Sequence, residues 1–123
     1  MTNIYEQETH EDTPVNITLE ELVSLKEECK TLISNAECAR NLLKNEDFKK
    51  VIQVEYFENQ PKRLGLLIAS GRMPPASMED TIADLKSIGN LANFLNDVIQ
   101  KGEIAKTEIA NLQEAYDDSV ENS

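Results

Sequence analysis

The stretch LVSLKEECKTLISNAECARNLL, residues 22–43, decides the fold, because its apolar residues recur at alternating steps of three and four. The series is Leu22, Leu25, Cys29, Leu32, Ala36, Ala39 and Leu43. Such spacing keeps side chains on one face, so it predicts an α-helix of about six turns that packs along its length. The seam is widened by three further apolar residues, Val23, Ile33 and Leu42, which favours contact with more than one neighbour.

The ends of this helix are marked by capping residues. Thr18 and Glu21 have the spacing of a capping box, in which each side chain accepts a hydrogen bond from the other residue's backbone N–H. Asn45 is a break followed by acidic residues, which suits the first turn of a new helix. The sequence therefore predicts a first helix over 19–44.

A second helix is predicted over 46–69, with Pro61 kinking or restarting it because proline lacks an N–H and clashes one turn back. Its apolar set, the expected aromatic centre of the fold, is Phe48, Val51, Ile52, Tyr56, Phe57, Leu64, Leu67 and Ile68. Residues 70–76 form the one clear loop, with Gly71 as a helix stop and two prolines after it.

Ser77 is the expected cap of a third helix, over 78–116. Its seam is Leu85, Ile88, Ala92, Leu95, Ile99, Gly102, Ala105, Ile109, Leu112 and Tyr116. One extra step of three falls at Gly102, an irregularity that either leaves one long helix or hinges it there.

These elements predict an all-α chain, either a long helical hairpin or a small three-helix bundle with coiled-coil-like seams. The first and third helices are expected to pack antiparallel, with 46–69 crossing at one end. A flexible acidic arm is expected at 1–17 and an acidic tail at 117–123, leaving one helical domain over 18–116.

The net charge is −11 and lies mostly at the ends of the chain. Residues 1–17 carry −4 and residues 107–123 carry −5, whereas all 12 bases lie between them. Nucleic-acid binding is disfavoured, because phosphate contacts need clustered lysine and arginine. Two cysteines that face opposite sides of one helix indicate a reducing, non-secreted setting, and the short apolar runs indicate a soluble chain with no membrane span.

Residues suited to catalysis are sparse, so the sequence predicts no enzyme, no cofactor and no metal site. The single histidine, His10, would have to build any metal or general-base site alone. Cys29 lies on the first seam, where a buried thiol is expected. The only mildly basic region is 44–72, with a net charge of +2 and the candidate basic contacts Lys49, Lys50, Lys62 and Arg63.

The runs 42–52, 56–57, 63–67 and 99–103 resemble small helical proteins encoded among the virion genes of tailed bacteriophages. The resemblance covers about residues 42–110. Pro61 departs from it, because that position is ordinary helix in such proteins. The resemblance implies a virion or head-assembly component and carries over no functional residues.

The leading expectation is thus a non-enzymatic structural protein that forms a homo-oligomer, docks on a larger assembly, or does both. We expect it in the host cytoplasm during assembly, and in the virion as a structural component. The predicted interaction seam is Leu22, Leu25, Leu32, Leu43, Leu85, Ile88, Leu95, Ile99, Ile109 and Leu112. Two alternatives remain open: an acidic inhibitor of a host nucleic-acid-binding or defence protein, and a small DNA-packaging subunit contacting DNA through 44–72.

Overall fold

The computed structural model describes residues 17–121, which are all-α. The elements are α1 (Leu19–Lys44), α2 (Glu46–Phe48), the π-helix η2 (Lys49–Asn59), α3 (Gln60–Ala69) and α4 (Pro75–Glu121). Because α2, η2 and α3 follow one another without a break, they make one helical stretch of mixed type over 46–69. The expected acidic arm, Ile17 excepted, and the last two residues lie outside the described residues.

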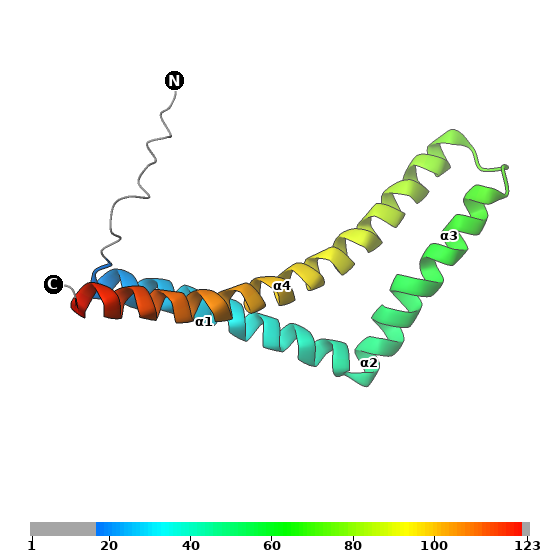
Figure 1. Cartoon of the computed structure of the whole chain (residues 1–123). Helices are drawn as coiled ribbons and strands as arrows, with labels where there is room; N and C mark the ends of the chain where they lie inside the picture. The colour runs from blue at the N-terminus through cyan, green and yellow to red at the C-terminus, as the bar shows by residue number, and fades with distance from the viewer. Residues whose placement is uncertain (1–16, 122–123) are drawn as a thin grey trace, which may run out of the picture.

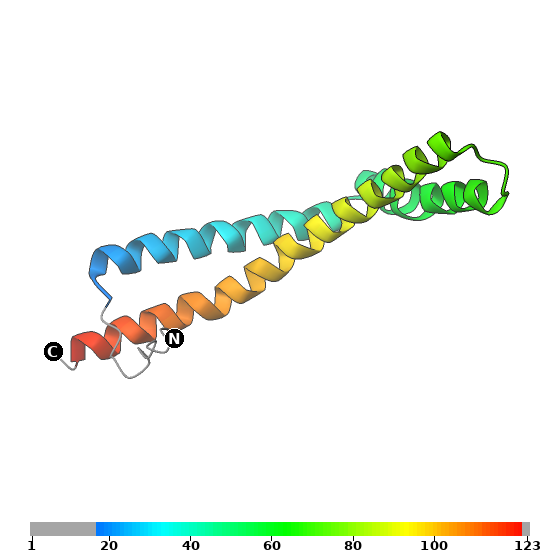
Figure 2. The ribbon, with the colours of Figure 1, turned by 90° about the horizontal axis from the view of Figure 1, so that it is seen from above.

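The molecule consists of two arms that share α4 (Figures 1 and 2). In the first arm, α1 packs antiparallel to the C-terminal part of α4, as predicted. In the second, η2 and α3 lie alongside the N-terminal part of α4. The expectation that 46–69 crosses the end of the α1–α4 pair is wrong. This stretch leads away from that pair and packs against the N-terminal part of α4, which α1 does not cover.

The capping residues fix both ends of α1. The Glu21 N–H donates to the Thr18 hydroxyl at 3.1 Å, and the Thr18 N–H donates to the Glu21 carboxylate at 3.0 Å. At the other end Asn45 is extended, and its side chain accepts from the Phe48 N–H at 2.9 Å. The predicted bounds of the first helix and the break at Asn45 are confirmed.

The π-helical register of η2 ends beside Pro61. The Gln60 N–H donates to the carbonyl of Glu55, five residues back, and regular α-helix restarts there. An α-register would leave the carbonyl of Phe57 facing a proline that has no N–H to offer. The π-register ends before the proline, and the α-helix that begins at Gln60 has Pro61 in its first turn, where a missing N–H is tolerated. The predicted restart at Pro61 is confirmed.

The loop after α3 turns at Gly71, which has a φ of +72°. Ser77 does not cap α4; the helix begins at Pro75, and the Met78 N–H donates to the Pro74 carbonyl at 2.9 Å. Proline suits the first turn, where its missing N–H would have no partner in any case. At its other end α4 continues to Glu121 rather than ending near residue 116, so the first part of the expected acidic tail is helical.

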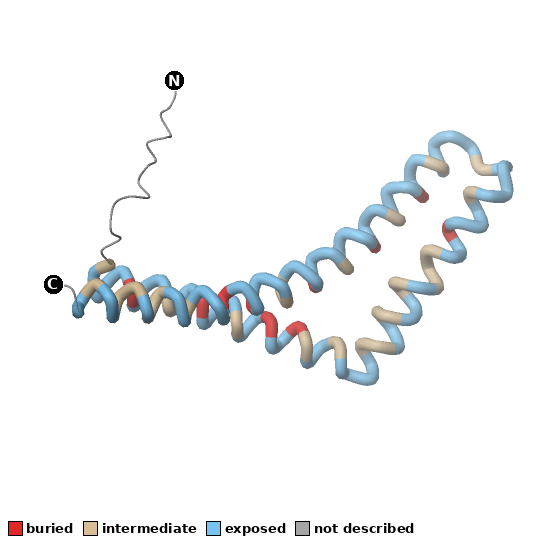
Figure 3. The backbone as a smooth tube through the Cα atoms, viewed as in Figure 1, coloured by how far each residue is buried: buried red, intermediate tan, exposed pale blue. Residues whose placement is uncertain are grey.

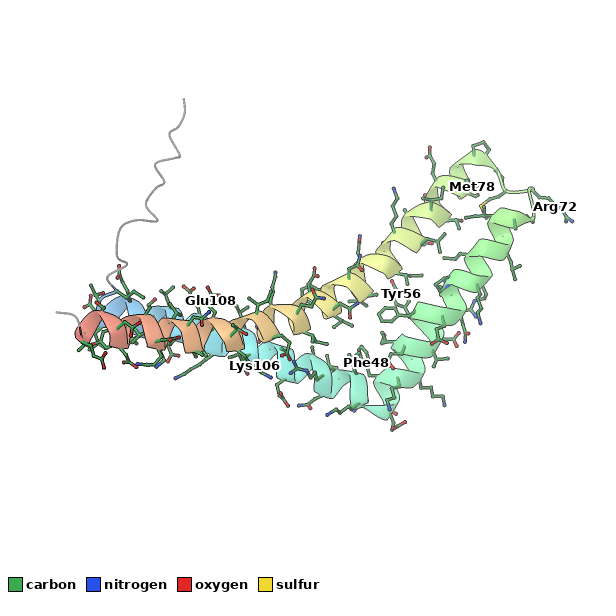
Figure 4. All side chains as sticks on the ribbon, viewed as in Figure 1. Phe48, Tyr56, Arg72, Met78, Lys106 and Glu108 are labelled. Carbon is green, nitrogen blue, oxygen red and sulfur yellow. The ribbon has the colours of Figure 1, made fainter. Side chains whose placement is uncertain are left out.

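The buried residues are few and are spread thinly along the two arms (Figure 3). The buried apolar set is Leu22, Cys29, Ala36, Ala39, Leu64, Ile88, Leu95 and Ala105. In the second arm, Phe48 and Tyr56 point into the space between the helices but stay half-buried (Figure 4). A cavity of about 260 Å³ lies there against Tyr56 and Ile88. The space between the helices of the second arm is therefore incompletely filled.

Gly102 is a point of close approach and not a hinge. The helix runs through it without interruption, and Gly102 is buried against α1. A Cβ at this position would overlap the Cβ of Ala36 and would lie 3.0 Å from the backbone oxygen of Leu32. The extra step of three therefore coincides with a glycine that lets the backbone of α4 approach Ala36 and Leu32 of α1.

Replacing Gly102 with alanine is expected to lower the free energy of unfolding by about 1–3 kcal/mol, because the added methyl overpacks the contact with Ala36. Gly89 is the matched control, since an added Cβ there meets nothing within 4 Å. Gly89→Ala should raise stability by up to about 1 kcal/mol through helix propensity. Urea denaturation measures both, and equal effects would contradict the close-approach interpretation. Ala36→Gly should rescue part of the loss in Gly102→Ala.

Candidate functional site

The first arm has two edges of different character, and one of them is closed by polar contacts between α1 and α4. Lys26 donates to the Gln113 side chain at 2.5 Å, and Arg40 forms an ion pair with Glu103. Glu103 also lies 3.6 Å from Lys106. These contacts join the two helices along one edge and hold their antiparallel register.

The opposite edge is open and largely apolar. Lys26 and Glu28 are two residues apart, about 200° around a helix, so Glu28 lies away from the cross-linked edge. Figure 4 likewise shows Glu108 and Lys106 on opposite edges of the arm. Two cavities lie on the open side. The larger, about 640 Å³, is lined by Ile17, Ile104, Thr107, Glu108, Asn111, Leu112 and Ala115.

The smaller cavity, about 140 Å³, is lined by Leu25, Glu28, Cys29, Leu32, Glu108 and Leu112. Since the two cavities share Glu108 and Leu112, they form one surface along the arm. We call this surface the open face and define it by Ile17, Leu25, Glu28, Leu32, Ile104, Glu108, Leu112 and Ala115. Three of its apolar side chains are well exposed: Leu25 at 38%, Leu32 at 37% and Ile104 at 63%.

The charge of the open face is negative. Its charged members are the two carboxylates Glu28 and Glu108, and no described residue that lines either cavity is a lysine or arginine. Cys29 lies between them at the floor of the smaller cavity. Burial raises the pKa of its thiol, and the charges of Glu108 and Glu28 raise it further. The raised pKa is a local sign of the same negative potential.

Most residues of the predicted interaction seam pack against other helices of the same chain. Leu22, Ile88 and Leu95 are buried, and the half-buried members are Leu43, Leu85, Ile99, Ile109 and Leu112. Leu25 and Leu32 belong to the same periodic series but remain more than one-third exposed. A single neighbouring helix covers only part of such a wide stripe, and these two leucines are what it leaves uncovered.

The four candidate basic contacts do not form one cluster. Lys49 and Lys50 precede Lys62 and Arg63 by about 18 Å of helix. Lys49 lies 3.6 Å from Glu46, and Arg63 lies 3.0 Å from Glu55. Hydrogen bonds from Asn59 and then Arg63 lower the pKa of the Glu55 carboxyl. Part of the positive charge of this region is therefore already paired.

The remaining candidates from the sequence are metal ligands, the histidine and the two cysteines. Among residues 17–121, no group of three or more histidine, cysteine, aspartate or glutamate side chains could hold a metal ion. His10 lies outside the described residues. Cys29 and Cys38 are both free thiols, the first buried as expected and the second exposed.

Five components of the open face were not predicted from the sequence: Ile17, Glu28, Ile104, Glu108 and Ala115. Ile104 lies off the seam, and the two carboxylates are 80 residues apart in the chain. Only the pairing of α1 with α4 brings them to one edge. The sequence does contain a weak signal of this surface, because four residues of α4 that line the larger cavity follow one another at helical spacing: Ile104, Glu108, Asn111 and Ala115.

Comparisons with protein-family models, with curated proteins and with solved structures found no match for this chain. Within the described range, none of the helices is both long enough and apolar enough to cross a membrane. The surfaces of the molecule itself are therefore what indicates its function.

Cys38 is expected to be alkylated by iodoacetamide about tenfold faster than Cys29, because Cys29 is buried and its pKa is raised. Mass spectrometry of the modified peptides measures both rates in the folded chain. Glu108→Gln should speed the reaction of Cys29 and leave Cys38 unchanged. Equal rates in the unmutated chain would contradict the burial of Cys29 under the open face.

Stability should also fall at alkaline pH. The thiol of Cys29 has a higher pKa in the folded chain than in the unfolded one, where it is near the ordinary value of 9.0. Its contribution to folding is complete below that pH and is lost as the pH rises through the raised pKa. Urea midpoints from pH 7 to 10.5 measure the loss, and Cys29→Ala should make the decline shallower.

Proposed function

We propose that this chain is a non-enzymatic interaction protein that acts as a component of a bacteriophage virion or of head assembly. The observation that carries the proposal is the open face, an exposed apolar surface on an ordered two-helix arm. Exposed apolar surface rimmed by polar residues is typical of protein interaction sites. The resemblance of residues 42–110 to small phage virion proteins supports the choice of assembly.

The shape of the molecule supports the same proposal. In each of the two thin arms the paired stretches of helix face only one another, so much of the apolar surface stays accessible, including Leu19, Val23 and Leu42 on α1. A third helix placed on the open face would complete a bundle around Leu25 and Leu32. In this proposal the partner comes from the assembly, which forms in the host cytoplasm.

The DNA-packaging alternative has less support. Neutralising several phosphates requires unpaired bases grouped on one surface. Here Lys49 and Arg63 lie next to carboxylates, and the two basic pairs are separated along the helix. The carboxylates of the open face support the inhibitor alternative. The apolar residues of the open face, however, favour a helix as partner over a nucleic-acid-binding groove.

The chain is expected in purified phage particles, or in capsid intermediates, at a fixed number of copies. Quantitative mass spectrometry of particles from cells that express the chain with the virion genes measures this. Ile104→Glu should lower incorporation at least about tenfold, because a charge is placed on the apolar open face. Val23→Glu is the matched control: Val23 is 53% exposed but lines neither cavity.

Absence of the chain from both particles and intermediates would contradict the proposal. Equal incorporation of the two variants would show that the open face is not the surface used. Circular dichroism verifies that both variants keep the helical content of the unmutated chain.

A further inference from the structure

A second exposed apolar surface lies on α3, at the far end of the molecule from the open face. Leu66 is 73% exposed and Leu67 is 51% exposed. Lys62 and Arg63 precede them by four residues each, so each base lies one turn from a leucine on the outer side of the helix. Leu64, by contrast, is buried on the side of α4.

The charge of this surface is positive. The segment from Gln60 to Arg72 contains three bases and no aspartate or glutamate. Arg63 is paired with Glu55 of η2, so the unbalanced positive charge comes from Lys62 and Arg72. Arg72, in the loop, is exposed and extends from the outer end of the second arm (Figure 4). We call the surface formed by Lys62, Arg63, Leu66, Leu67 and Arg72 the basic tip.

The basic tip and the open face are complementary in charge and in length. One presents leucines beside bases, and the other presents leucines and an isoleucine beside Glu28 and Glu108. The ten residues of α3 span about 15 Å, somewhat less than the roughly 18 Å of the twelve residues of α4 from Ile104 to Ala115. The α3 part of the helical stretch 46–69 therefore fits along the open face, and the rest of that stretch continues beyond it.

The two surfaces cannot meet within one molecule. They lie at opposite ends of the two-armed chain, as the positions of Arg72 and Glu108 in Figure 4 show. Two open faces placed together would oppose carboxylates to carboxylates, and two basic tips would oppose bases to bases. Charge thus disfavours both symmetric contacts between these surfaces and favours the mixed one.

We infer that the basic tip of one copy docks on the open face of a second copy, with Leu66 and Leu67 packing against Leu25, Leu32 and Ile104. The inference rests on the proposed function in that it names the partner of the open face. The contact is heterologous, so every copy offers one surface of each kind. Successive copies then form a ring if the rotation closes and a filament if it does not.

The test uses two variants of the full chain that each block one surface. Leu66→Glu blocks the basic tip and Ile104→Glu blocks the open face. Sedimentation velocity and light scattering over a concentration series measure the mass. The unmutated chain should grow well beyond its 13.8 kDa with concentration, and each variant alone should stay monomeric.

Mixing the two variants in equal amounts is the decisive step. Each retains the surface that the other lacks, so the mixture should form a one-to-one complex that cannot extend. Val23→Glu should assemble like the unmutated chain. A mixture that stays monomeric, or single variants that still assemble, would overturn the inference.

A charge exchange provides a second route that leaves the apolar residues in place. Lys62→Glu and Glu108→Lys should each weaken assembly about tenfold, and an equal mixture of these two variants should recover it, because the tip of each variant then meets an oppositely charged face on the other. The double variant, with both changes in one chain, should recover it, since every contact again joins opposite charges. Failure of the double variant to recover would overturn the charge pairing.

The outcome separates this inference from the proposed function. A chain that is monomeric at every concentration yet present in phage particles overturns the contact between copies and leaves the open face to another protein or to the chain's own N-terminal segment. A chain that assembles tip to face yet is absent from particles supports the contact and contradicts the virion role.

Discussion

The arrangement of the whole molecule depends on the approach of two helix backbones at Gly102 and Ala36. Ala36 is completely buried, and Gly102 offers no side chain to separate the helices. Ala39 and Ala105 continue the same pattern of small residues on either side. Because a larger residue at Gly102 would force the helices apart, this contact fixes the register in which α1 and α4 pair. The polar contacts of Lys26 and Arg40 then close one edge of that pair and leave the other edge open.

Much of the fold could be predicted because its signals are local. Thr18, Glu21 and Asn45 act through hydrogen bonds to backbone groups within one turn, so the bounds of the first helix follow from the sequence. Two other local features were ambiguous or misleading. Gly102 fits a hinge and a close approach equally well until the neighbouring helix is known, and Ser77 resembles a cap although Pro74 and Pro75 already begin the helix.

Local sequence signals predict neither the π-helical register nor the open face. A five-residue register has no periodic signature of its own, and it changes which residues share a face. Val51 and Leu67, both in the predicted apolar set of this stretch, are exposed. Likewise, periodicity places Leu25 and Leu32 on a seam but does not say how many helices will cover it. Glu28 and Glu108 meet only through long-range pairing, and it is their charge that gives the open face its chemical preference.

The unbroken course of α4 has a mechanical consequence. The helix spans about 70 Å and belongs to both arms. It acts as a rigid strut, meaning that its course sets the direction of one arm relative to the other. Figure 1 shows this strut curved where it passes from one arm to the other. In an assembly joined tip to face, the curvature of α4 becomes the angle between one copy and the next. A straighter strut would give a wider ring or an open filament, so residues along the outer side of α4 would tune the size of the assembly without touching either contact surface.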